Sequence, residues 1–421
     1  MEGAMSGKNK VLFVFGLNQG LHWFTIGLII PVLTLLLMER GFDLAQIGIA
    51  MALMSFTVFF LELPTGGLAD SIGRKRVYMI SVLFNIAAYL LLLFVDSPPA
   101  LIFAAFALGV GRALSSGTMD AWFIDEHRKT GCTDIVLQQN LARAGIIIPA
   151  ALGGGTLIGG ALPDLFGNWL KAVTPFGFYG PNLILMILLF LSQLIITAVL
   201  VREERAEFTG NIAEGFKKLP SVLGSAMTYG IRQRNTMAIL LSTAALGAGL
   251  AGLEQLWQPR IRELVPETGI WVLGVISALY FLAAAGGSAL SPVMLRKFGY
   301  RYSFLLFIFR LIMGALYLAL SFAGGLPSFA PLYLLIFLAH GVTGSPEMTV
   351  YNRDIPNEKR STMLSLNSLF LQGGGAFGSI IAGQMAFRLF IPAAWWLTGG
   401  LLCLSAFFYL MIKEEAHENR V

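Results

Sequence analysis

Four apolar stretches of the chain carry polar or ionisable side chains three, four or seven residues apart, the spacings that place side chains on one face of an α-helix. Charged groups in such stretches are costly to bury, at about 2.5–3.5 kcal/mol each, so each one needs a reason. The carboxylates could bind protons or cationic groups, and the imidazoles could transfer protons. The candidates are Asn18 and His22; Arg112, Ser116 and Asp120; Glu254 and Trp257; and His340 and Glu347.

These side chains are set in a strongly apolar chain. Of its 421 residues 56% are apolar and 13% are charged, whereas soluble domains carry about 25% charged residues. A helix of about 20 apolar residues crosses a bilayer, and only closed helices or barrels satisfy their backbone there. Twelve such spans are predicted, at 11–38, 46–63, 77–95, 100–124, 141–162, 181–201, 236–257, 270–295, 302–322, 329–350, 362–387 and 391–412.

Lysine and arginine fall mainly on one side of these spans. With a cytoplasmic N-terminus, 21 of the 29 Lys and Arg residues lie in cytoplasmic segments, five lie on the opposite side and three lie inside spans. Because positive residues are retained in cytoplasmic loops, we expect a multi-pass protein of the cell membrane with both termini in the cytoplasm. The net charge of +5 is then an orientation signal, and no nucleic-acid partner is expected.

The segment between the second and third spans contains a motif of glycine, acid and basic residues. The order is a glycine, three residues, an aspartate, two residues, a second glycine and a basic cluster. This segment resembles the signature loop of the major facilitator superfamily. In physical terms the glycines allow close helix packing, and the aspartate is a fixed charge that can meet a helix N-terminus. The matching residues are Gly66, Asp70, Gly73, Arg74 and Lys75.

Two acids near this loop complete an expected cytoplasmic gate, or latch. Glu62 precedes the loop, and Asp125 lies at the end of the fourth span, where the resemblance implies an acid that pairs with the loop arginine, here Arg74. Asp120 lies deeper in the same span and remains open to either role, in the latch or in a cavity.

The same resemblance covers the second half of the chain and implies the fold. The loop between the eighth and ninth spans keeps Gly299 and its basic residues, but Arg296 stands where the first copy has Asp70. Leu108 and Arg112 partly match the drug:proton antiporter branch of the superfamily. The resemblance implies an all-α membrane protein with twelve transmembrane helices in two pseudo-symmetric six-helix bundles. The central cavity of that fold is lined mainly by spans one, four, seven and ten, which are the spans that carry the polar residues.

Structural roles compete with functional ones for several of these residues. His22 and His340 could form hydrogen bonds between helices or transfer protons. Arg112 and Asp120 lie about 12 Å apart by helical rise, which is too far for direct contact, so each needs another partner. Snorkelling or structural pairing is expected for two further arginines inside spans, Arg143 and Arg310.

The domains are expected at 1–201 and 236–421, with a cytoplasmic linker at 202–235 that could lie on the membrane surface. No metal-ligand cluster, nucleophile constellation or phosphate-binding loop is found in the sequence, so no metal site, cofactor or enzymatic activity is expected. A monomer in the lipid bilayer is expected.

The function that fits best is proton-coupled export of small hydrophobic or amphiphilic compounds by alternating access. Glu254 or Glu347 would bind the proton or a cationic substrate group, and Arg112 could move relative to such an acid. Three alternatives remain open: uptake of a nutrient or organic ion by a symporter or uniporter, lysolipid translocation, and a non-transporting sensor.

Overall fold

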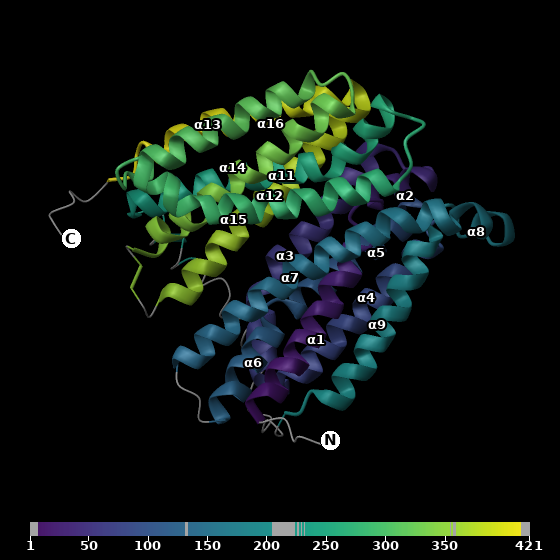
Figure 1. The fold of residues 1–421 in the computed structure, drawn as a ribbon, viewed down its shortest axis with the longest axis horizontal. Helices are drawn as coiled ribbons and strands as arrows, with labels where there is room; N and C mark the ends of the chain where they lie inside the picture. Colours follow the sequence, from purple (N-terminus) through teal and green to yellow (C-terminus); the bar gives the residue numbers. More distant parts are fainter. Residues whose placement is uncertain are drawn as a thin grey trace. The chain divides into compact units, whose positions relative to one another are not determined.

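The computed structural model describes residues 7–130, 134–203, 224, 227–228, 230, 232–353, 355–356 and 359–413. The described secondary structure is helical throughout, with no strand among these residues (Figure 1). Most of the expected linker at 202–235, including residues 204–223, lies outside the described residues.

The helices follow the predicted spans closely. Ten helical segments of the described chain are long and apolar enough to cross a membrane. Two more long helices, α1 and α15, occupy the places of the predicted first and eleventh spans. These twelve segments contain the following helices, with α5 and α6 in one segment: α1 (Gly7–Gly27), α3 (Leu44–Ile72), α4 (Arg74–Leu93), α5 (Pro98–Ser115), α6 (Thr118–Lys129), α7 (Asp134–Leu162), α9 (Gly180–Leu200), α11 (Arg234–Leu264), α12 (Trp271–Lys297), α13 (Tyr302–Ser321), α14 (Leu326–Arg353), α15 (Arg360–Arg388) and α16 (Ile391–Tyr409).

Two predicted spans are interrupted in the structure. The first span breaks after α1 and resumes as α2 (Leu33–Glu39); Pro31 lies in the break and has no N–H to continue a helix. The fourth span breaks between α5 and α6 at Gly117, whose φ of 66° is a left-handed conformation that glycine adopts without strain. A short π-helix, η1 (Pro163–Gly167), and the short α8 (Asn168–Val173) follow α7.

The chain forms two compact units. Unit 1 comprises Met1–Phe42, Phe56–Leu219 and Gly269–Ala278, and unit 2 comprises Asp43–Ser55, Pro220–Thr268 and Leu279–Val421. The start of α3 therefore belongs to unit 2, where Gln255 Nε2 donates to the Leu44 carbonyl at 3.0 Å. The start of α12 belongs to unit 1, where Trp271 N donates to Asp164 Oδ2 at 2.9 Å.

In unit 2, α11 packs against α14, α15 and α16, and α13 packs against α14 and α16. The contact between α11 and α15 is a direct contact of backbones. A Cβ added to Gly374 would collide with the Ala244 carbonyl, and one added to Gly247 would collide with the Leu371 carbonyl. Small residues permit this close approach between membrane helices.

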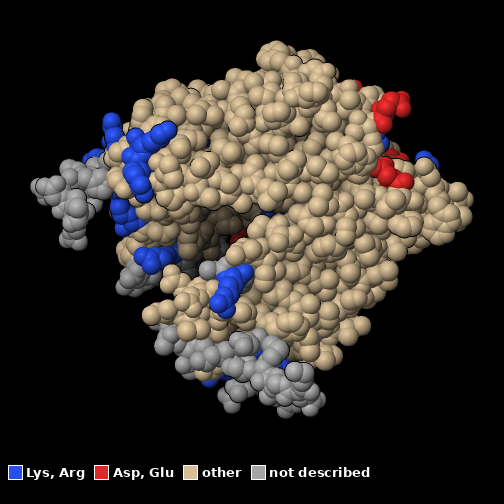
Figure 2. Space-filling view, viewed as in Figure 1, with Lys and Arg blue, Asp and Glu red and all other residues tan. Residues whose placement is uncertain are grey.

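The face of unit 2 drawn in Figure 2 is almost entirely uncharged. Lys and Arg side chains gather over one end of its helices, and Asp and Glu side chains gather over the other end (Figure 2). An uncharged belt between charged ends is the distribution that helices spanning a bilayer require.

Candidate functional site

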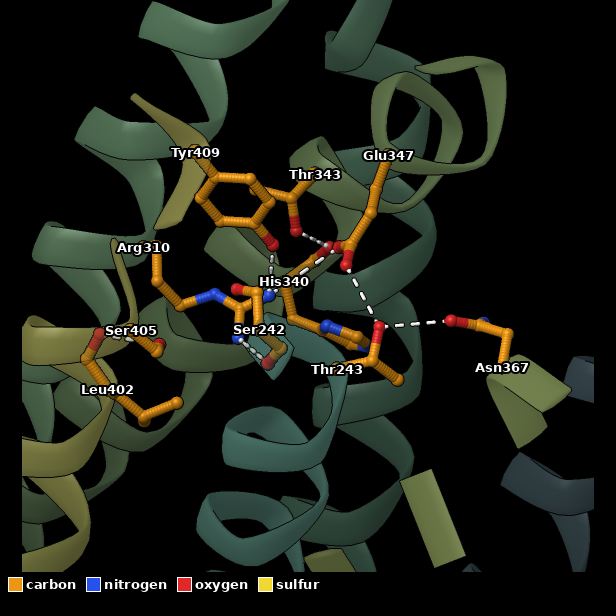
Figure 3. A network of polar contacts seen from close by, with 10 residues as sticks. All are labelled: Ser242, Thr243, Arg310, His340, Thr343, Glu347, Asn367, Leu402, Ser405 and Tyr409. Carbon is orange, nitrogen blue, oxygen red and sulfur yellow. Dashed lines mark hydrogen bonds and ion pairs between the residues drawn. The ribbon is translucent and has the colours of Figure 1, made fainter. Parts of the chain in front are cut away.

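Arg310 is the centre of a polar network inside unit 2. It lies on α13 and is fully buried, with 0% exposure. Its Nη1 donates to the Ser242 carbonyl at 2.9 Å, and its Nη2 donates to Tyr409 Oη at 2.6 Å (Figure 3). The same Nη2 lies 3.5 Å from Glu347 Oε2 on α14. The guanidinium therefore connects four helices, α11, α13, α14 and α16.

Glu347 is held more loosely than its arginine partner. Its side chain is 10% exposed, and its contacts to Arg310 and Thr243 Oγ1 are long, at 3.5 and 3.3 Å. The Tyr409 hydroxyl also lies within reach of its carboxylate. Glu347 therefore lies between a buried guanidinium on α13 and an uncharged hydroxyl on α11.

Thr243 on α11 links Glu347 to α15. Its hydroxyl lies 3.3 Å from Glu347 Oε1 and 3.1 Å from Asn367 Oδ1 (Figure 3). Two acceptors thus face one hydroxyl, which carries a single hydrogen.

His340 lies on α14, seven residues before Glu347 and hence on the same face of that helix. It lies within electrostatic reach of Arg310. Its buried Nδ1 has no hydrogen-bond partner among the described residues. The structure therefore brings two of the predicted site residues, His340 and Glu347, into the environment of Arg310.

Glu254 lies on α11 beside a cluster of aromatic rings, all of them in unit 2. The carboxylate is exposed and acts electrostatically on the Tyr280 and Tyr333 phenols. Trp257 is 1% exposed, and its ring centroid lies 5.4 Å from that of Tyr333. Tyr280 stacks on Phe337 at 4.3 Å. The aromatic rings themselves are buried, and the Glu254 carboxylate is the exposed charge near them.

Asn18 and His22 are packed within unit 1. Asn18 is fully buried and accepts a hydrogen bond of 2.7 Å from Thr197 Oγ1 of α9. The His22 ring lies against Tyr78 and Phe190, with ring centroids 6.1 and 5.9 Å away. These contacts connect α1 to α4 and α9, so both residues have structural partners and are not part of the network around Arg310.

The fourth-span candidates separate at the helix break. Arg112 is exposed near the end of α5, and Ser116 is an exposed residue at the C-terminal end of that helix. Asp120 lies on α6 and accepts a 3.4 Å hydrogen bond from Gln19 Nε2. The structure gives Asp120 a partner on α1, within the same unit.

The expected latch residues meet at the start of α4. Arg74 Nη1 lies 3.0 Å from Asp125 Oδ2, the acid that the sequence favoured over Asp120. Glu203 accepts from the backbone N–H groups of Arg74 and Lys75 at 2.8 and 3.0 Å, where a carboxylate satisfies free helix donors. Three other expected latch residues, Glu62, Gly66 and Asp70, lie on α3, and the Asp70 side chain is outside the described part of the chain. Gly73 precedes α4 with a φ of 95°.

Sequence reasoning did not assign a functional role to Arg310, Thr243, Asn367, Tyr409 or Glu203. A feature of the sequence could have identified Arg310. An arginine in the middle of an apolar span needs an acid, and Glu347 of the next span was already a candidate. No sequence pattern marked Thr243 or Asn367, since single hydroxyl and amide side chains are common inside helices.

Long apolar helices that are able to cross a bilayer define a multi-pass α-helical membrane protein. The chain belongs to the major facilitator superfamily, because the model of that family matches residues 15–379. The predicted fold class is therefore confirmed.

Curated relatives and solved structures agree with this assignment. The quinolone resistance protein NorA of Staphylococcus aureus (strain MSSA476) is 25% identical, and the alignment covers 97% of each chain. The MFS-type transporter YxaM of Bacillus subtilis (strain 168) is 22% identical over 96% of this chain and 94% of that protein. The nucleoside transporter NupG has a TM-score of 0.77 at 14% identity, covering 96% and 100% of the two chains. A bacterial homologue of the human lysosomal transporter Spinster has a TM-score of 0.74 at 15% identity, covering 97% of each chain.

Proposed function

We propose that this transporter exports small hydrophobic or amphiphilic compounds in exchange for protons, by alternating access. The observation that carries the proposal is the fully buried Arg310 paired with Glu347 at 3.5 Å. An ion pair inside membrane helices is costly to maintain, and such groups commonly mark ion or proton pathways.

The network allows Glu347 to take up a proton without leaving Arg310 unpaired. When Glu347 is protonated, Arg310 retains the Tyr409 hydroxyl at 2.6 Å and the Ser242 carbonyl at 2.9 Å. Its guanidinium also lies over the Tyr409 ring, 5.3 Å from the centroid. These contacts reduce the penalty of a buried cation that has lost its carboxylate. Glu347 is therefore the proposed proton carrier.

Glu254 is the proposed contact for a cationic substrate group. Its exposed carboxylate lies within electrostatic reach of the buried Tyr280 and Tyr333 rings, which an organic cation would contact only after these helices move. The similarity to proteins named for quinolone resistance supports a drug-like substrate.

The test is transport by purified protein in liposomes with an imposed pH gradient. Glu347→Gln is expected to lower gradient-driven transport at least about tenfold, because the amide cannot exchange a proton. Glu263→Gln is the matched control, since Glu263 pairs with Arg260 on the exposed part of α11. Unchanged gradient-driven transport in Glu347→Gln would refute the proton-carrier role.

A substrate panel in the same liposomes tests the direction and the substrate class. It contains a lipophilic cation, a neutral amphiphile, a nucleoside, a sugar and a lysolipid. Export of the lipophilic cation with proton entry is expected, and Glu254→Gln is expected to weaken transport of the cation more than that of the neutral amphiphile. Proton-driven uptake of the sugar or the nucleoside would contradict export, and movement of the lysolipid alone would favour a lipid translocator.

A further inference from the structure

The Thr243 hydroxyl has more acceptors than hydrogens. Glu347 Oε1 lies 3.3 Å away and Asn367 Oδ1 lies 3.1 Å away, yet the hydroxyl can donate one hydrogen bond at a time. Thr243 is 4% exposed, so water has little access to resolve the competition. The direction in which Thr243 donates can therefore change when Glu347 gains or loses a proton.

We propose that Thr243 is a positioning residue that transmits the protonation state of Glu347 to Asn367 on α15. The proposal rests on the proposed role of Glu347 as proton carrier. With Glu347 ionised, Thr243 donates to the carboxylate, and the Asn367 oxygen receives no hydrogen from it. With Glu347 protonated, the new carboxyl hydrogen is donated to Thr243 Oγ1, and Thr243 donates its own hydrogen to Asn367 Oδ1. One proton is gained at Glu347, and no hydrogen leaves Thr243.

The hydrogen bond between Thr243 and Asn367 lies on the seam where α11 and α15 are in direct backbone contact. Gly247 of α11 is four residues beyond Thr243, and it meets the carbonyl of Leu371, four residues beyond Asn367. Residues four apart share a helix face, so the hydrogen bond is one turn from this backbone contact. A gain or loss of the bond acts directly on the close-packed pair of helices.

The other groups around Glu347 come from different helices. Arg310 approaches from α13, Tyr409 approaches from α16, and His340 lies on the same helix as Glu347. The sides facing α11 and α15 present the uncharged Thr243 and Asn367. Thr243 thus links Glu347 to Asn367 on α15.

The experiment compares two transport modes in liposomes for the native protein, Thr243→Val and Thr243→Ser. One mode is accumulation driven by a pH gradient, and the other is substrate exchange without a gradient. Valine has the shape of threonine but no hydroxyl, so the ratio of driven transport to exchange is expected to fall about tenfold. The exchange rate of Thr243→Val is also expected to lose most of its dependence on pH. Serine keeps the hydroxyl and is expected to retain the native ratio within about twofold.

Asn367→Leu removes the acceptor on α15 and serves as the second variant. It is expected to reproduce the ratio of Thr243→Val, and it keeps the proposal testable if Thr243→Val does not fold. A native ratio in Thr243→Val or in Asn367→Leu overturns the role of Thr243 if Glu347→Gln has lost driven transport. If Glu347→Gln itself retains driven transport, the result refutes the proton-carrier role of Glu347 in the proposed function. A structural role alone would lower both transport modes together and leave their ratio and pH dependence unchanged.

Discussion

Buried tyrosines in unit 2 differ in whether the protein provides a partner for the phenol hydrogen. Tyr351 is 1% exposed and donates to the Met363 carbonyl at the start of α15. Tyr317 and Tyr333 are both fully buried, and their hydroxyls have no hydrogen-bond partner among the described residues. A satisfied buried hydroxyl contributes to stability, whereas an unsatisfied one does not.

This difference predicts different results for the same chemical change. Tyr351→Phe is expected to lower the free energy of unfolding by about 1 kcal/mol, because it removes the hydrogen bond that a buried phenol donates to the Met363 carbonyl. Tyr317→Phe removes a buried hydroxyl without breaking a hydrogen bond to the described protein, so it is expected to be neutral or to raise the free energy of unfolding by up to about 1 kcal/mol. The measurement is thermal unfolding of both variants in detergent. Equal losses in the two variants would contradict this account of the Tyr317 hydroxyl.

At the scale of helices, glycine decides which pairs come close enough for short polar side chains to meet. Thr243 and Asn367 have short side chains, and they reach each other because α11 and α15 touch at Gly247 and Gly374. The same helices at an ordinary separation of 8–10 Å would leave such groups apart. The site network therefore depends on backbone contact that lies outside the network itself.

Gly374→Ala is expected to separate α11 from α15 and to destabilise the protein by about 1–3 kcal/mol, because the added methyl group collides with the Ala244 carbonyl. Gly400→Ala is the matched control in unit 2, since a Cβ at Gly400 of α16 would meet nothing within 4 Å. Alanine favours helix over glycine, so the control is expected to be neutral or slightly stabilising. Thermal unfolding compares the two variants, and equal midpoints would rule out the close contact.

At the scale of the whole chain, the sequence predicted the helices better than the site. An apolar run of about 20 residues can be recognised from one continuous stretch of sequence, and the described helices occupy the predicted places. The partners of Arg310 could not be read in this way, because Glu347 is 37 residues away and Tyr409 is 99 residues away. The break at Pro31 was also missed, although a proline inside an apolar run is a visible signal.

The orientation of the chain in the membrane remains a prediction from the distribution of lysine and arginine. Glu267 lies in the exposed loop between α11 and α12, which should face the outside, and Tyr300 lies in the exposed loop between α12 and α13, which should face the cytoplasm. Each position takes a single cysteine, as Glu267→Cys or Tyr300→Cys, in a chain whose two native cysteines, Cys132 and Cys403, are replaced by serine.

A membrane-impermeant maleimide added to intact cells is expected to label Glu267→Cys and to leave Tyr300→Cys unlabelled until the cells are opened. The physical reason is the excess of Lys and Arg in the segments assigned to the cytoplasm, which are retained on that side during insertion. Permeabilised cells supply the control, since both positions should then react. The reverse pattern in intact cells would place the termini outside, and protons would then have to reach Glu347 from the opposite side of unit 2.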